Sequence, residues 1–192
     1  MKSRVRGSLL FGCFGLLSGL ISSVGLVVLN LDIFKSLDWA DLYPIYVPGF
    51  IFGIVMAMPF LLYKRRFNAR SIILWIIGSG GAYMIAYCSV ILLYFAEIPL
   101  SLIMFFIAGC VGAMFMLTAF SYCLVKIRPI PFLLLTTLGG VLALSFLTDI
   151  HILFLKSVFS EYGVLYIVWQ TGMASAIGWT ICPSENAQVK NG

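Results

Sequence analysis

Six stretches of this sequence are apolar over lengths that suit one crossing of a lipid bilayer. A transmembrane helix needs about 20 mostly apolar residues, at about 1.5 Å of rise each, to cross about 30 Å of hydrocarbon. The pattern therefore predicts an all-α membrane protein, built as a bundle of six transmembrane helices. We place its segments at Ser8 to Leu29, Ile45 to Tyr63, Ser71 to Phe95, Leu100 to Val125, Ile130 to Leu147 and Gly163 to Cys182.

The composition excludes an ordinary water-soluble surface. Of the 192 residues, 62% are hydrophobic and only 10% are charged, whereas soluble domains contain about 45–50% apolar and about 25% charged residues. No change in composition and no linker rich in Gly, Ser or Pro divides the chain. We therefore expect a single transmembrane domain over residues 1–182, followed by a short polar cytoplasmic tail over residues 183–192.

The charged residues between these segments separate by sign. With six crossings, ten of the twelve basic residues fall on the side that holds both termini, and six of the seven acidic residues fall on the other side. Basic residues in short loops mark the cytoplasmic side of a membrane, so we expect both termini in the cytoplasm. The basic residues on that side are Lys2, Arg4, Arg6, Lys64, Arg65, Arg66, Arg70, Lys126, Arg128 and Lys190.

This charge arrangement accounts for the net charge of +5 without a nucleic-acid partner. The basic loops would lie beside the anionic lipids of the cytoplasmic leaflet, where each basic residue contributes about 1 kcal/mol of attraction. The expected partners are the lipid bilayer and either a small-molecule solute or another membrane protein. The small size and the short loops favour the bacterial inner membrane as the location.

Each predicted segment contains two small residues four positions apart. Such a pair lies on one helix face and lets two helix backbones approach closely. The pairs would either pack the bundle itself or line a thin-walled cavity or an oligomer interface. They are Gly15 and Gly19, Gly49 and Gly53, Gly78 and Ala82, Gly109 and Ala113, Gly139 and Ala143, and Gly172 and Ala176.

No charged residue and no histidine lies near the centre of a predicted segment. A charge within the membrane costs about 2.5–3.5 kcal/mol on insertion scales and is usually retained for an ion or proton path. Its absence disfavours a pump that uses a carboxylate in the middle of the membrane. A binding site would have to use amides and hydroxyls, and the candidate ligand-binding residues are Gln170, Thr136, Thr137, Tyr83 and Tyr87.

Three of these candidates have alternative, purely structural explanations. Both ends of a buried amide need hydrogen-bond partners in lipid. Gln170 would therefore contact a solute, hydrogen-bond a neighbouring helix, or reach the outer interface. Tyr83 and Tyr87 stand one helical turn apart. They would line a polar path, or they would pack in the bundle with their hydroxyls bonded to partners.

The fifth segment is the shortest, and glycines follow Thr136 and Thr137 at its centre. Short, glycine-interrupted helices line the binding sites of some transporters. A break would fall near Gly139, with a counterpart near Gly80 in the third segment. The alternative is a continuous helix whose threonine hydroxyls bond back to their own turn.

The sequence assembles no catalytic or metal-binding set of side chains. His151 is the only histidine and lies near Asp149, and no C-x-x-C pair occurs among the five cysteines. A zinc site or a nucleophile-base-acid set needs more such groups in one place. A P-loop and other cofactor-binding motifs are also missing. We therefore expect no catalytic residue, no metal, no cofactor and no energy-coupling module of the chain's own.

A weak internal periodicity of about 60 residues relates the odd-numbered segments to one another, because in each an arginine precedes a glycine by nine to eleven residues. This spacing predicts three helical-hairpin repeats around an axis normal to the membrane. The pairs are Arg6 and Gly15, Arg70 and Gly80, and Arg128 and Gly139.

Two functions from different classes fit the sequence. The first is transport, by a small permease, a channel-like protein or a substrate-binding membrane subunit. The second is a non-enzymatic accessory or scaffold protein that binds another membrane protein or lipid through its small-residue faces. A membrane enzyme is a third interpretation, for which Asp149 with His151 and Asp32 with Asp38 are the only clusters.

The size and the six-helix plan resemble those of the small substrate-binding membrane subunits of vitamin uptake systems. This resemblance covers the number and length of the helices and involves no shared motif. A fold can host many functions, so the resemblance implies an architecture and leaves the solute open.

Overall fold

The computed structural model describes residues 2–29, 39–62, 68–96, 101–144 and 161–182. Within these ranges every element of regular structure is a helix, which confirms the all-α prediction. The helices are α1 (Lys2–Leu29), α2 (Trp39–Leu62), α3 (Ala69–Phe95), α4 (Ser101–Cys123), α5 (Pro129–Ala143) and α7 (Glu161–Ile181). The predicted polar tail and the pair Asp149 and His151 lie outside the described residues.

Local sequence signals explain where two of the helices begin. Asn68 precedes α3 in an extended conformation, and its side chain accepts a hydrogen bond from the backbone N–H of Arg70, as helix N-caps commonly do. Helix α5 begins at Pro129, directly after the extended Arg128. Proline suits the first turn of a helix and forces the preceding residue out of the helical region.

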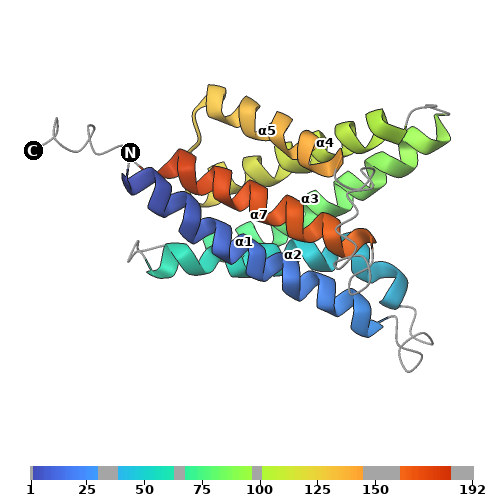
Figure 1. Ribbon diagram of the computed structural model, residues 1–192, viewed down its shortest axis with the longest axis horizontal. Helices are drawn as coiled ribbons and strands as arrows, with labels where there is room; N and C mark the ends of the chain where they lie inside the picture. Colours follow the sequence, from blue (N-terminus) through green and yellow to red (C-terminus); the bar gives the residue numbers. More distant parts are fainter. Residues whose placement is uncertain (1, 30–38, 63–67, 97–100, 145–160, 183–192) are drawn as a thin grey trace, which may run out of the picture.

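The six helices pack in a closed ring in the order α1, α2, α3, α4, α5, α7 and back to α1. Figure 1 shows the first helix lying along the last, with α7 between α1 and α5. The contact between α1 and α7 is the most extensive in the ring, and the contact between α5 and α7 is smaller. The first and last described helices, α1 and α7, thus pack against each other as one long pair.

Small residues account for the close approach of α1 and α7. A Cβ atom added at Gly15 would lie 2.5 Å from the carbonyl oxygen of Gln170 and 2.6 Å from the Cβ of Ala174. At Gly19 an added Cβ would lie 2.6 Å from the Cα of Ile167. Any larger residue at these positions would push the two backbones apart.

The remaining small-residue pairs also face neighbouring helices. Gly49 and Gly53 of α2 lie against α3, while Gly109 of α4 lies against α5. An added Cβ at Gly78 of α3 would meet Ala119 of α4, and one at Gly172 of α7 would meet the side chain of Leu142 of α5. Gly139 contacts Ala113, Gly109 contacts Ala143, and Ala82 and Ala176 pack in or against the core.

The surface of the bundle is apolar, as expected of a protein that faces lipid. Large side chains such as Ile130, Leu92 and Leu134 expose 73%, 68% and 67% of their surface. Four helices are long and apolar enough to cross a bilayer, over Ser3–Gly25, Ala69–Phe95, Leu102–Cys123 and Gly163–Ile181. Two shorter apolar helices, Val47–Pro59 and Pro129–Ala143, accompany them. The chain is therefore a membrane protein.

The centre of the bundle holds a row of aromatic rings. Trp75 is fully buried and lies 5.3 Å from Phe120 and 6.4 Å from Phe52 between ring centroids. Phe52 in turn lies 6.1 Å from Trp169, which lies 5.3 Å from Tyr83. These rings meet edge to face, which is a favoured geometry for aromatic pairs. The row connects α4, α3, α2 and α7 across the core.

Helices α3 and α5 run without interruption through their glycines. Of the two alternatives for Gly80 and Gly139, the structure has continuous helices and no break. The hydroxyl of Thr136 donates to the carbonyl of Phe132 at 2.9 Å, and that of Thr137 donates to the carbonyl of Leu133 at 3.1 Å. The threonine hydroxyls are satisfied within their own helix, so no unwinding is needed to find them partners.

Candidate functional site

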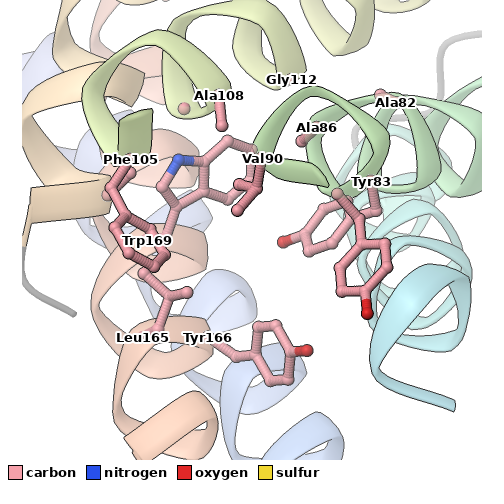
Figure 2. A pocket seen from close by; sticks show the side chains of 13 residues that line it. Ala82, Tyr83, Ala86, Val90, Phe105, Ala108, Gly112, Leu165, Tyr166 and Trp169 are labelled. Atoms are coloured by element: carbon pink, nitrogen blue, oxygen red, sulfur yellow. The ribbon is translucent and has the colours of Figure 1, made fainter. Parts of the chain in front are cut away.

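A cavity of about 120 Å³ lies between α3, α4 and α7. Figure 2 shows side chains from these helices surrounding it, with Tyr166 and Trp169 of α7 facing the side chains of α3 and α4. The described residues that line it are Ala82, Tyr83, Ala86, Tyr87 and Val90 of α3, Phe105, Ala108, Gly109 and Gly112 of α4, Ala143 of α5, and Leu165, Tyr166 and Trp169 of α7.

The cavity arises from an unequal distribution of side-chain size. The wall formed by α3 and α4 is rich in alanine and glycine, and an added Cβ at Gly112 would lie 2.8 Å from the Cβ of Ala86. These two helices therefore lie close together and leave little side-chain volume on their inner face. Helix α5 ends at Ala143, which lines the cavity.

The aromatic side chains of the cavity are held in fixed positions. The indole N–H of Trp169 donates to the carbonyl of Gly139 on α5 at 3.0 Å. The ring of Tyr83 lies 5.3 Å from the ring of Trp169 and 6.3 Å from the ring of Tyr166 between centroids. A site whose rings are already ordered loses little conformational entropy when a ligand binds.

The chemistry of the cavity suits an apolar ligand. None of the described residues that line the cavity is charged. The polar side-chain groups of these residues are three tyrosine hydroxyls and the indole N–H of Trp169, which already donates to the carbonyl of Gly139. Ligand pockets are typically apolar with a few polar groups that fix orientation. An apolar cavity of about 150 Å³ in another protein stays dry and binds benzene. A ligand about the size of one aromatic ring fits this space.

Gln170 lies beside this cavity at the meeting point of α7, α1 and α2. The residue is fully buried, and its Nε2 donates to the carbonyl of Pro48 at 3.3 Å and, more weakly, to the hydroxyl of Ser22 at 3.5 Å. Its Oε1 is buried and accepts no hydrogen bond from the described residues. The amide thus ties three helices together and keeps one acceptor unused.

The hydroxyl of Tyr83 has Gln170 and Tyr166 as its polar neighbours. Within the described chain the hydroxyls of Tyr83 and Ser18 are buried and have no hydrogen-bond partner. A buried polar group without a partner costs about 1–3 kcal/mol. A polar group on a bound ligand, or an ordered water, would offset that cost at Tyr83, which lines the cavity.

No family model, no curated protein and no solved structure matches this chain. The interpretation of the site rests on its geometry.

The structure brings some of the predicted site residues together and separates others. Tyr83 and Tyr87 line the cavity, and Gln170 adjoins it through Tyr83. Thr136 and Thr137 are not among the lining residues. Their hydroxyls bond to α5 itself, and the side chain of Thr137 is exposed on the outside of the bundle.

Several lining residues were missed by the sequence analysis, chiefly Trp169, Tyr166, Phe105 and Leu165. A signal for one of them was present, because Trp169 directly precedes the costly Gln170 on α7. The alanines and glycines at four-residue spacing on α3 and α4 were a second signal. The sequence left helix packing and a thin-walled cavity open for these residues, and Ala86 and Gly112 both contact each other and line the cavity.

Proposed function

We propose that this chain is a transport-related membrane protein that binds a small, mostly apolar solute in the cavity between α3, α4 and α7. The observation that carries the proposal is an apolar space walled by ordered aromatic rings, with tyrosine hydroxyls beside it. Such a site fits a small permease, a channel-like protein or a substrate-binding membrane subunit. The solute we infer has about the size of one aromatic ring and one hydrogen-bonding group for Tyr83.

The proposal includes six membrane crossings. Helix α2 has 24 residues and spans about 36 Å, enough to cross about 30 Å of hydrocarbon. Helix α5 has 15 described residues and spans about 22 Å, so its crossing requires a locally thinner bilayer or further helical residues. The position of α5 in the ring between α4 and α7 supports this crossing.

Three hairpin repeats also remain part of the proposal. Glycines of α1, α3 and α5, which would each begin a hairpin, support the repeats. Gly15 and Gly19 of α1 pack on α7, Gly80 of α3 packs on Phe50 of α2, and Gly139 of α5 packs on Ala113 of α4. These glycines face the helix that precedes their own in the ring, whereas Gly78 of α3 faces α4, which follows it. Repeats around a common axis would produce this pattern.

Single cysteines at exposed positions will test the orientation. In a cysteine-free background, a membrane-impermeant maleimide added to intact cells should label Ala96→Cys, which follows α3, and should label Lys126→Cys only after the membrane is opened. Both side chains are exposed, and the positive-inside rule places them on opposite sides. Equal labelling of the two positions in intact cells would contradict the proposed topology.

The scaffold alternative loses its main sequence argument. Gly49 and Gly53, which were expected to present a face to a partner, lie against α3 within the chain. Replacing both by leucine would therefore disturb the bundle itself, and loss of a partner in that variant would say nothing about an interface.

Binding of small aromatic probes will test the cavity. Indole and p-cresol should bind the purified protein in detergent, and Val90→Trp, which places an indole in the cavity, should weaken this binding at least about tenfold, or about 1.4 kcal/mol. Val24→Trp is the matched control, because Val24 lies on α1 with half of its side-chain surface exposed and does not line the cavity. That variant should bind the probes as the wild type does.

Isothermal titration would measure the affinity. Equal affinities for the wild type and for a folded Val90→Trp protein would rule out this cavity as the site. If the cavity serves transport, vesicles that contain the wild-type protein should also take up the labelled solute faster than vesicles that contain Val90→Trp.

A further inference from the structure

A second hollow lies on the outside of the bundle, where α7 forms the floor of a groove between α1 and α5. Figure 1 shows α7 between these two helices. The groove has a volume of about 610 Å³ and lies at the end of the bundle where α1 and α5 begin and α7 ends. It is separate from the solute cavity, since the two share no lining residue.

The groove changes in character along its length. Arg4 and Ser8 of α1 and Thr180 of α7 lie toward its outer end, whereas Leu138 of α5 and Gly172 of α7 lie deeper in the bundle. From Thr180 to Gly172 the helix rises about 12 Å. That length is close to half of the roughly 30 Å of hydrocarbon in a bilayer, so the groove spans about one leaflet.

The positive charge of Arg4, at the outer end of the groove, faces no acidic side chain among the described lining residues. Within the described chain the Nε of Arg4 is buried and has no hydrogen-bond partner. A buried N–H of a charged group without an acceptor is costly, and Arg4 has one at its Nε. The planar set of donors of a guanidinium matches a phosphate group, which it binds through two parallel hydrogen bonds.

We infer that this groove is a binding site for one anionic phospholipid, with its phosphate on Arg4 and an acyl chain along Gly172 and Leu138. The occupant follows from the combination of an arginine whose buried Nε has no partner within the described chain and a mostly apolar channel about one leaflet deep. Gly172 lines the deep end of the groove, beside the side chain of Leu142 of α5. The lipid belongs to the cytoplasmic leaflet, a step that rests on the proposed topology.

The neighbouring arginine on α1 provides a matched control. Arg6 carries the same charge two residues further along, is exposed and does not line the groove. A specific site should distinguish Arg4→Gln from Arg6→Gln, whereas a general attraction between basic residues and anionic lipid should affect the two variants equally.

Thermal unfolding of the detergent-purified protein with added lipid tests the inference. Dioleoyl phosphatidylglycerol at saturation should raise the melting temperature of the wild type and of Arg6→Gln by about 5 °C or more. Dioleoyl phosphatidylcholine should raise it less, and water-soluble glycerol 3-phosphate should leave it unchanged because it has no chain to fill the groove. Arg4→Gln should lose most of the stabilisation by phosphatidylglycerol.

A second variant keeps the test decisive if Arg4→Gln fails to fold. Ser8→Phe retains the guanidinium and fills the groove beside it, so it should also lose the response to phosphatidylglycerol. An equal response of the wild type, Arg4→Gln and Ser8→Phe would overturn the inference, as would an equal loss in Arg4→Gln and Arg6→Gln. Such a result would not affect the proposed solute site, because the binding of indole and p-cresol is measured at the separate cavity between α3, α4 and α7.

Discussion

Replacing Gly15 by leucine is expected to abolish the folded protein. The added side chain would begin 2.5 Å from the carbonyl oxygen of Gln170 and 2.6 Å from the Cβ of Ala174, and one of these atoms belongs to the backbone and cannot rotate away. The two helices would have to separate along the most extensive contact of the bundle. We expect a loss of about 3 kcal/mol or more, at the upper end of what overpacking causes.

The measurement is size-exclusion chromatography of the detergent-solubilised protein, in which Gly15→Leu should lose the monodisperse peak. Gly81→Leu is the matched control, because a Cβ added at Gly81 of α3 meets no atom within 4 Å. That variant makes the same chemical change in an apolar helix and should stay folded. A monodisperse Gly15→Leu protein with wild-type stability would show that α1 and α7 do not pack as described.

Replacing Trp75 by alanine is expected to cost about 3–5 kcal/mol of stability, the range found for large aromatic residues in cores. Trp75 is fully buried between Phe52 and Phe120, and its indole N–H donates to the carbonyl of Gly53 at 2.8 Å. Alanine would leave a cavity at the centre of four helices and would also remove the hydrogen bond between α3 and α2. Both effects weaken the inner part of the bundle.

Denaturation in mixed micelles would give the change in unfolding free energy. Trp75→Phe should cost less than Trp75→Ala because it keeps most of the packing and loses mainly the hydrogen bond, which within membranes contributes about 0.6 kcal/mol on average. Trp179→Ala is the positional control, since Trp179 is 43% exposed on α7. Similar losses for Trp75→Ala and Trp179→Ala would argue against the aromatic row as the core.

Much of the helical organisation follows from the sequence. Apolar segments predicted four of the six helix starts to within two residues. The two exceptions are α1, which begins at Lys2 and thus before the expected Ser8, and α2, which begins at Trp39 and thus before the expected Ile45. Hydropathy detects the part of a helix that lies in hydrocarbon, whereas polar and basic residues continue the same helix into the interface. The sequence therefore identifies these helices better than it fixes where they start.

The site was harder to predict, because helices that are apolar on every side carry no periodic signal for their inner face. Polar residues were the only markers of that face: Tyr83 lines the cavity, whereas Thr136 does not, and its hydroxyl bonds within its own helix. Trp169 and Phe105 look like lipid-facing residues in the sequence. Only the ring order of the helices shows that Trp169 and Phe105 face a cavity.

The closure of the ring by α1 and α7 has a consequence for biogenesis. The glycine face of α1 is synthesised first, yet the helix that covers it is completed only at Ile181. At about 5–20 residues per second, the nascent chain carries this uncovered face for roughly 10 to 30 s. During that interval an insertion chaperone or a second polypeptide can reach Gly15 and Gly19, and a chain truncated before α7 would remain open to the same capture and to proteolysis.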